Sequence, residues 1–223
     1  MSEQSGFLTS KILLLNGPRL CGKTFFVDFL QRWYNIRDCR CKDKLIVLTR
    51  ELFCLSKKEF DTLYNERDTK ETPVPEFTIT TQAFKKLMAF LGKDSGERLA
   101  DKQDRDFIHL SVREALIYVS EIIVKPSFGK AYFGDTRANS LQSKHWYIDD
   151  STGFEEEIYP LLKRLRHEDI LLVRVRGRGE FTGDSRGYIR EGVVKNTVDV
   201  YNTGTEKEYL QKMMDLAEDF YVS

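Results

Sequence analysis

The stretch GPRLCGKT, residues 17–24, constrains the fold of this chain more than any other. It satisfies the pattern G-x-x-x-x-G-K-[ST], in which a glycine-rich turn leads into a helix. The mostly apolar stretch KILLLN, residues 11–16, indicates a short buried strand before the turn, and residues 24–34 repeat apolar side chains at helical spacing after it. This order predicts an open α/β sheet in which the turn lies at the carboxyl end of a strand.

Strands and helices alternate along the rest of the 223 residues. Strands are expected at residues 11–16, 44–50, 145–150, 170–175 and 197–202. Helices are expected at residues 24–34, 81–92, 110–126, 154–166 and 205–220. Strands that are joined by crossover helices form a mostly parallel sheet with helices on both faces. We therefore predict a single α/β domain over residues 1–223.

Two of the expected helices carry clear signals at their ends. Ser111 with Glu114, and Thr205 with Glu208, have the spacing of a capping box, and Pro126 is expected to end the first of these helices. Most of the region at about residues 50–110 is polar and irregular. A connection of this length predicts an insertion, which we place on the acceptor side of the domain.

Each fixed position of the glycine-rich motif suits a phosphate chain. The glycines let successive backbone N–H groups face phosphate oxygens, and the start of the helix adds partial positive charge. Lys23 would reach the β- and γ-phosphates, and the Thr24 hydroxyl would ligate Mg²⁺. A chance match is expected in about one chain in a hundred of this length. We predict that ATP and Mg²⁺ bind through Gly17, Pro18, Arg19, Leu20, Cys21, Gly22, Lys23 and Thr24.

Two acidic residues, Asp149 and Asp150, end the expected strand at 145–150. Successive strand residues face opposite ways, but both could contribute where the chain turns at the sheet edge. One carboxylate would hold Mg²⁺ through water and the other could accept a proton. The residue order does not fix which does which, so Asp149 and Asp150 are both catalytic candidates, and Asp149 is also a candidate metal ligand. A solvated acidic strand end is the alternative.

Arginines supply the third candidate group. Arg113 lies in the first turn of its helix, where the macrodipole disfavours a cation, and we give it a catalytic role. Arg137 is expected in a polar loop before the acidic strand. Arg176 and Arg178 alternate with glycine in the basic segment at about residues 174–195, which we expect to act as a lid over the triphosphate. The alternative for each of these arginines, taken singly, is a solvated surface charge.

We predict that most aromatic side chains pack in the protein core. Phe25, Phe26 and Phe29 repeat at helical spacing and are expected in the core. Trp33 and Trp146 could stack on a base, but packing is the commoner role of tryptophan.

Composition and cysteine spacing exclude several classes. The formal net charge is zero, so no overall field attracts a polyanion. No apolar stretch is long enough to predict a signal peptide or a membrane partner, and we expect a protein of the host cell cytoplasm. The four cysteines have no routine zinc spacing, which predicts free thiols and no structural metal. Nothing in the residue order fixes the oligomeric state.

The chain resembles the bacteriophage deoxynucleoside monophosphate kinases in four segments. These are the glycine-rich motif, SVREALIYVSEIIVKPSFGKAYFG, YIDDSTGFEEE and VDVYNTGTEKEYLQKM. The resemblance implies a P-loop NTPase fold with a five-stranded parallel core, a mobile lid, and adenine near the NTGT loop. It implies an ATP site at Gly17, Gly22, Lys23 and Thr24, and a phosphate-facing or acceptor-side role for Arg113.

Two departures from that family bear on the acceptor. The glycine-rich motif reads Gly-Lys-Thr-Phe, where these kinases often have Gly-Lys-Asp followed by a hydroxyl residue. The segment DDSTGFEEE also contains no basic residue, where such kinases tend to place an arginine. A phosphate acceptor is already ionised near neutral pH and needs cations, whereas a hydroxyl acceptor needs a base.

The paired acids therefore favour the related phage kinases that phosphorylate 5-hydroxymethyluracil in DNA during thymidine hypermodification. The segment 174–195 would then contact the DNA backbone, and Phe154 or Tyr188 would hold a flipped base. The alternative is a deoxynucleoside monophosphate kinase. A P-loop switch ATPase or binding module is the third possibility.

Overall fold

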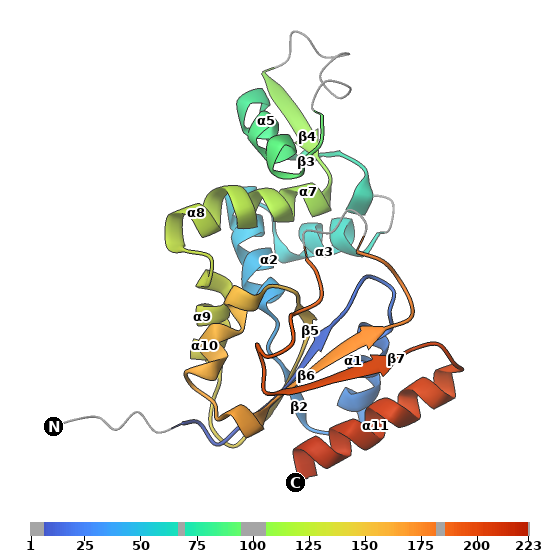
Figure 1. Ribbon diagram of the computed structural model, residues 1–223. Coiled ribbons are helices and arrows are strands. Elements are labelled where there is room, and N and C mark those ends of the chain that lie inside the picture. Colours follow the sequence, from blue (N-terminus) through green and yellow to red (C-terminus); the bar gives the residue numbers. More distant parts are fainter. Residues whose placement is uncertain (1–6, 67–69, 95–105, 182–185, 223) are drawn as a thin grey trace, which may run out of the picture. The chain divides into compact units, whose positions relative to one another are not determined.

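The computed structural model describes residues 7–66, 70–94, 106–181 and 186–222 (Figure 1). The chain divides into two compact units. The first comprises Met1–Lys42 and Ala131–Ser223, and the second comprises Asp43–Lys130. The expected insertion at about residues 50–110 falls within the second unit, and each unit is described by itself.

A five-stranded sheet forms the centre of the first unit. Its strands lie in the order β2 (Ile36–Asp38), β5 (Trp146–Thr152), β1 (Lys11–Asn16), β6 (Ile170–Arg176) and β7 (Asn196–Tyr201). Every neighbouring pair is parallel. The predicted α/β class with a parallel sheet is therefore confirmed, and the arrangement is compatible with a P-loop NTPase-like fold.

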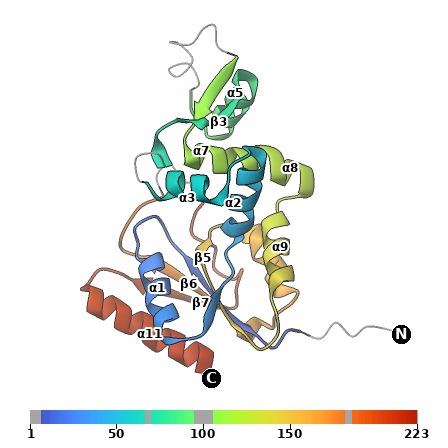
Figure 2. The same cartoon turned by 180° about the vertical axis from the view of Figure 1, so that it is seen from behind.

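Helices cover both faces of this sheet (Figures 1 and 2). Helices α1 (Lys23–Trp33) and α11 (Glu206–Val222) pack on the face that carries Leu13 and Leu15. The opposite face packs against α9 (Tyr132–Ser140) and α10 (Tyr159–Leu162). Because side chains alternate along a strand, the apolar residues 12–15 of β1 supply both cores at once.

The second unit has a separate core. It contains α2 (Cys41–Leu52) from Asp43 onward, α3 (Lys57–Asn65), β3 (Val74–Thr80), α5 (Thr81–Phe90), β4 (Phe107–Leu110), α7 (Val112–Ile117), the π-helix η1 (Tyr118–Val124) and α8 (Lys125–Phe128). Strands β3 and β4 pair antiparallel. Phe60, Phe77 and Phe84 are fully buried at the centre of this core. The second unit is thus a folded module and not an irregular connection.

The structure corrects the expected strand at residues 44–50, which lies inside helix α2. The second strand is instead β2, Ile36–Asp38, whose three residues are too few to show a period. A short apolar run such as LIVL does not by itself separate a strand from a buried helix, and here the longer helical pattern of α2 prevails.

Three further expectations differ in detail. Residues 154–166 form a 3₁₀ turn, η2 (Glu155–Glu157), followed by the single turn α10. Pro126 does not end its helix, because it lies in the first turn of α8, where a missing N–H costs little. Arg137 lies in helix α9 and is buried, not in a polar loop.

Glycine at position 134 allows α9 to approach η2 closely. A Cβ atom added there would lie 2.4 Å from the carbonyl oxygen of Glu157, whereas one added at Gly187 would meet nothing within 4 Å. We expect Gly134→Ala to lower the free energy of unfolding by about 1–3 kcal/mol through overpacking, and Gly187→Ala to change it by less than about 0.5 kcal/mol. Urea denaturation of both variants tests this contact, and equal midpoints would contradict it.

Candidate nucleotide-binding site

The glycine-rich turn joins β1 to α1 at the carboxyl edge of the sheet. Leu20 has φ 61° and Gly22 has φ 103°, so two residues of the turn adopt the left-handed conformation. A Cβ atom added at Gly17 would lie 2.6 Å from the Val175 carbonyl oxygen. Alternation of right- and left-handed residues curls a backbone into the concave shape that binds anions. The turn therefore has the conformation that a phosphate site requires.

Lys23 folds back over this turn. Its Nζ donates hydrogen bonds to the carbonyl oxygens of Gly17 at 2.7 Å and Pro18 at 2.6 Å, and lies 3.3 Å from Cys21 Sγ. Burial lowers the pKa of Lys23 below its ordinary value, although Cys21 and Asp150 oppose the shift. The ammonium group thus lies within the curled backbone, where a phosphate group could replace the carbonyl partners.

Asp150 extends from β5 to the first turn of α1. The Thr24 hydroxyl donates a hydrogen bond to Asp150 Oδ2 at 2.9 Å. The other carboxylate oxygen, Oδ1, is buried and accepts no hydrogen bond within the described residues. Lys42 Nζ lies 3.5 Å from it and Arg40 Nη1 3.9 Å. A hydroxyl and a buried carboxylate oxygen together are ligands that fit Mg²⁺ and its waters.

Asp149 points to the other side of the same strand and has different partners. It forms a buried ion pair with Arg137, whose Nη1 donates to Oδ2. Ser151 donates to Oδ1 from its backbone N at 2.7 Å and from its hydroxyl at 2.5 Å, and Thr152 Oγ1 donates to Oδ2 at 3.1 Å. The structure therefore brings Asp150, and not Asp149, to Thr24, because strand residues alternate in direction.

Asn16 connects three segments at this edge. Its Nδ2 donates to the carbonyl oxygens of Thr152 and Gly187, each at 3.0 Å, and its Oδ1 accepts from the Ile189 N–H at 2.9 Å. The Tyr188 hydroxyl also donates to the Val175 carbonyl oxygen at 3.0 Å. Residues 187–189, which belong to the expected lid at about 174–195, are thus held against the ends of β1, β5 and β6. Residues 182–185 of that segment lie outside the described residues.

The arginines expected to bind the cofactor have protein partners. Arg176 Nε and Arg174 Nε each donate to Asp199 Oδ1 at 2.8 Å. Against the opposing effect of burial, these bonds hold the pKa of Asp199 below its ordinary value. Arg178 Nη2 donates to the Gly204 carbonyl oxygen at 2.9 Å, within the NTGT loop. Arg176 and Arg178 thus tie the end of β6 to β7 and the loop that follows it.

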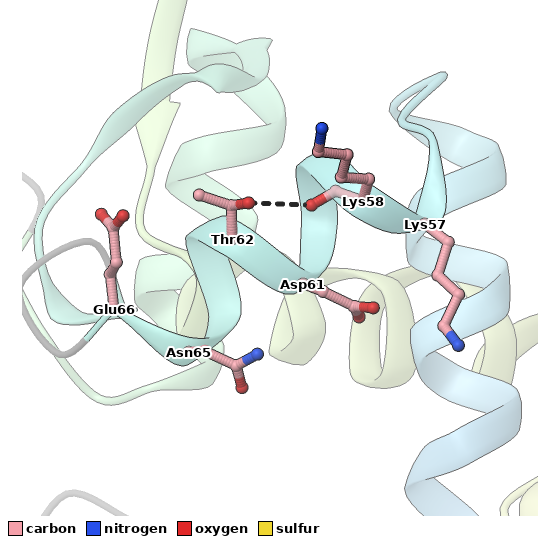
Figure 3. A pocket seen from close by; sticks show the side chains of 6 residues that line it. All are labelled: Lys57, Lys58, Asp61, Thr62, Asn65 and Glu66. Carbon is pink, nitrogen blue, oxygen red and sulfur yellow. Dashed lines mark hydrogen bonds between the residues drawn. The ribbon is translucent and has the colours of Figure 1, made fainter.

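Arg113 belongs to the second unit. Its Nε lies 3.2 Å from both carboxylate oxygens of Glu71. A pocket in the same unit lies along α3 (Figure 3), and its lining residues are Lys57, Lys58, Asp61, Thr62, Asn65 and Glu66. None of these residues was predicted to bind or to react, and a mixture of both charges along one helix is an ordinary solvated surface.

Two basic residues near the turn, Arg40 and Lys42, were not singled out from the sequence, and a third, Arg186, belongs to the expected basic segment at about 174–195. Arg40 and Lys42 follow the short strand β2, which has too few residues to show a period. Arg186 packs over Gly153, since a Cβ atom added to that glycine would lie 2.4 Å from Arg186 Cδ. Its charge also contributes to lowering the pKa of Lys23, after the larger effect of burial. The site therefore has cations from segments far apart in the chain.

Comparison with known proteins adds no assignment: no protein-family model and no curated protein matches the chain. Within the described residues, no helix is both long enough and apolar enough to cross a membrane.

The two aspartates should respond differently to substitution. Arg137→Met leaves the buried Asp149 charge without its partner, and we expect it to lower the free energy of unfolding by about 3–5 kcal/mol. Asp150→Asn should cost about 1 kcal/mol or less, because the amide oxygen can still accept from Thr24. Chemical denaturation measures both. Equal losses for the two variants would contradict this division of roles.

Proposed function

We propose that this protein is an ATP-dependent phosphotransferase that uses Mg²⁺. The observation that carries the proposal is the 2.9 Å hydrogen bond from the Thr24 hydroxyl to Asp150 Oδ2. It joins the last residue of the glycine-rich motif to an acid at the end of a neighbouring strand, which is the arrangement that P-loop enzymes use to hold a nucleotide-bound metal ion.

The proposed roles follow from the positions of the residues. Backbone N–H groups of residues 17–24 would bind the β-phosphate, and Lys23 would move from the Gly17 and Pro18 carbonyl oxygens to the transferred phosphoryl group. Thr24 and Asp150 would hold Mg²⁺, which neutralises charge on the phosphates when bound. Asp149 has no part in this scheme, because Arg137, Ser151 and Thr152 occupy its carboxylate.

The acceptor is proposed from the charges around Asp150. The expectation of 5-hydroxymethyluracil in DNA rested on two acids and no nearby cation. Only Asp150 reaches Thr24, and Lys42 and Arg40 place two cations within 4 Å of its carboxylate. An acceptor that carries a phosphate group matches such cations better than a neutral hydroxyl does. We therefore propose a deoxynucleoside monophosphate as the first acceptor to test.

Modified DNA remains the second candidate acceptor. Asp150 Oδ1 accepts no hydrogen bond within the described residues and could take a proton from a hydroxymethyl group. Residues 160–195 also carry nine Lys or Arg against five Asp or Glu, which suits a DNA backbone.

Transfer of label from γ-labelled ATP separates the candidates. We expect labelled diphosphates when deoxynucleoside monophosphates are supplied, and at least ~100-fold less product from Lys23→Ala, because a charge that stabilises the transition state is lost. Lys163→Ala, a change at an exposed lysine, serves as the matched control. Label in hydroxymethyluracil-containing DNA alone would favour the second acceptor. ATP hydrolysis that no acceptor stimulates would contradict both and indicate a switch ATPase.

Removal of the two cations tests the acceptor site by itself. Arg40→Gln and Lys42→Gln should each lower kcat/KM for the monophosphate by about tenfold or more, while the KM for ATP stays within about twofold. Arg37→Gln, on the exposed part of β2, is the control. An equal rise in both KM values would show that these cations bind ATP instead.

A further inference from the structure

One face of helix α1 carries exposed aromatic side chains. The helical spacing predicted Phe25, Phe26 and Phe29 in the core, but of these three only Phe26 is fully buried. Phe25 is 41% exposed and Trp33 72% exposed, and Phe29 is partly buried. The rings of Phe29 and Trp33 lie 6.5 Å apart. The helix thus uses the face with Phe26, Val27 and Leu30 for the core and presents an aromatic row, Phe25–Phe29–Trp33, to solvent.

Two unpaired charges lie beside this aromatic row. Asp28 and Arg32 are exposed, are spaced by four residues, and form no ion pair or hydrogen bond with another described residue. At 100° per residue both lie along the same flank of the row. Phenylalanine, tryptophan and arginine are the residue types that protein interfaces favour, and large exposed apolar patches mark such interfaces.

The surroundings of the row disfavour a nucleic acid as the partner. The neighbouring helix α11 carries five acidic and two basic residues. Its Glu218 accepts a hydrogen bond from Tyr34, directly after α1, at 2.8 Å. A polyanion would be repelled by this surface. The face of α1 is therefore suited to a protein helix that carries both apolar and mixed charged groups.

We propose that this face binds the same face of a second copy of the chain, with the two α1 helices antiparallel. A twofold axis near residue 30 places Asp28 of each copy opposite Arg32 of the other, because residues 28 and 32 lie at equal heights on either side of the axis. The same operation interleaves the aromatic rows, so that rings from the two copies alternate about every 3 Å along the axis.

We expect weak self-association because the contact between two helix faces is small. A contact through one helix face is smaller than a standard interface of roughly 1,600 Å², and we therefore expect a dimer that forms at high protein concentration. Association is independent of the nucleotide site, since the side chains that carry it do not include Lys23, Thr24 or Asp150.

Charge exchange provides the test. Sedimentation equilibrium of the full chain, up to about 1 mM, should show a reversible dimer. Asp28→Arg and Arg32→Asp should each raise its dissociation constant about tenfold or more, because each change places like charges opposite one another. An equimolar mixture of these two variants should form a heterodimer, and the double exchange in one chain should restore the homodimer.

Controls distinguish this face from other surfaces. Glu191→Arg and Lys195→Asp make the same charge changes at exposed residues away from α1 and should leave the dissociation constant within about twofold. Trp33→Ala should weaken the dimer even where the charges are intact. A monomer at every concentration overturns the proposal, as does a dimer that both charge reversals leave unchanged. Binding of an oligonucleotide that Trp33→Ala abolishes in a monomeric chain also overturns it.

Discussion

The buried ion pair of Arg137 and Asp149 fixes the end of β5, and the candidate site depends on that strand end. Asp149 is fully buried and receives hydrogen bonds from Ser151 and Thr152 as well as from Arg137. With one aspartate held on this side, strand alternation directs the next one, Asp150, to Thr24. A charge this deeply buried is costly without its partner, so α9, which supplies Arg137, supports a site that it does not touch.

Asn16 also fixes the position of a strand end, but through hydrogen bonds between uncharged groups. Its amide forms hydrogen bonds with backbone groups of Thr152, Gly187 and Ile189, of which Thr152 and Ile189 are buried and need such partners. The bonds hold the returning segment at 187–189 beside the glycine-rich turn, close to where Arg186 packs over Gly153. One buried asparagine at the end of β1 thereby joins a strand end to a segment more than 170 positions later in the chain.

The sequence predicted the parts of this unit whose signals are local. The apolar run of β1, the glycine-rich turn and the helical spacing of α1 lie within residues 11–33, and their structure follows from short-range patterns. Strand β2 and helix α2 were not found, because three residues show no period and LIVL fits a strand as well as a helix. The partners of Asp149 and Asp150 come from other elements, so that only tertiary structure distinguishes the two acids.

The aromatic residues of α1 show why periodicity alone misassigns burial. Phe25 and Phe26 are adjacent, and a helix places adjacent residues 100° apart, so both cannot face the sheet. The core takes Phe26, Val27 and Leu30, and Phe25 is left on the outer face with Trp33. A helix that packs on only one side needs one apolar stripe. The second stripe of α1 contributes little to the fold of a single chain, and its aromatic and charged residues have the composition of a surface that meets another protein.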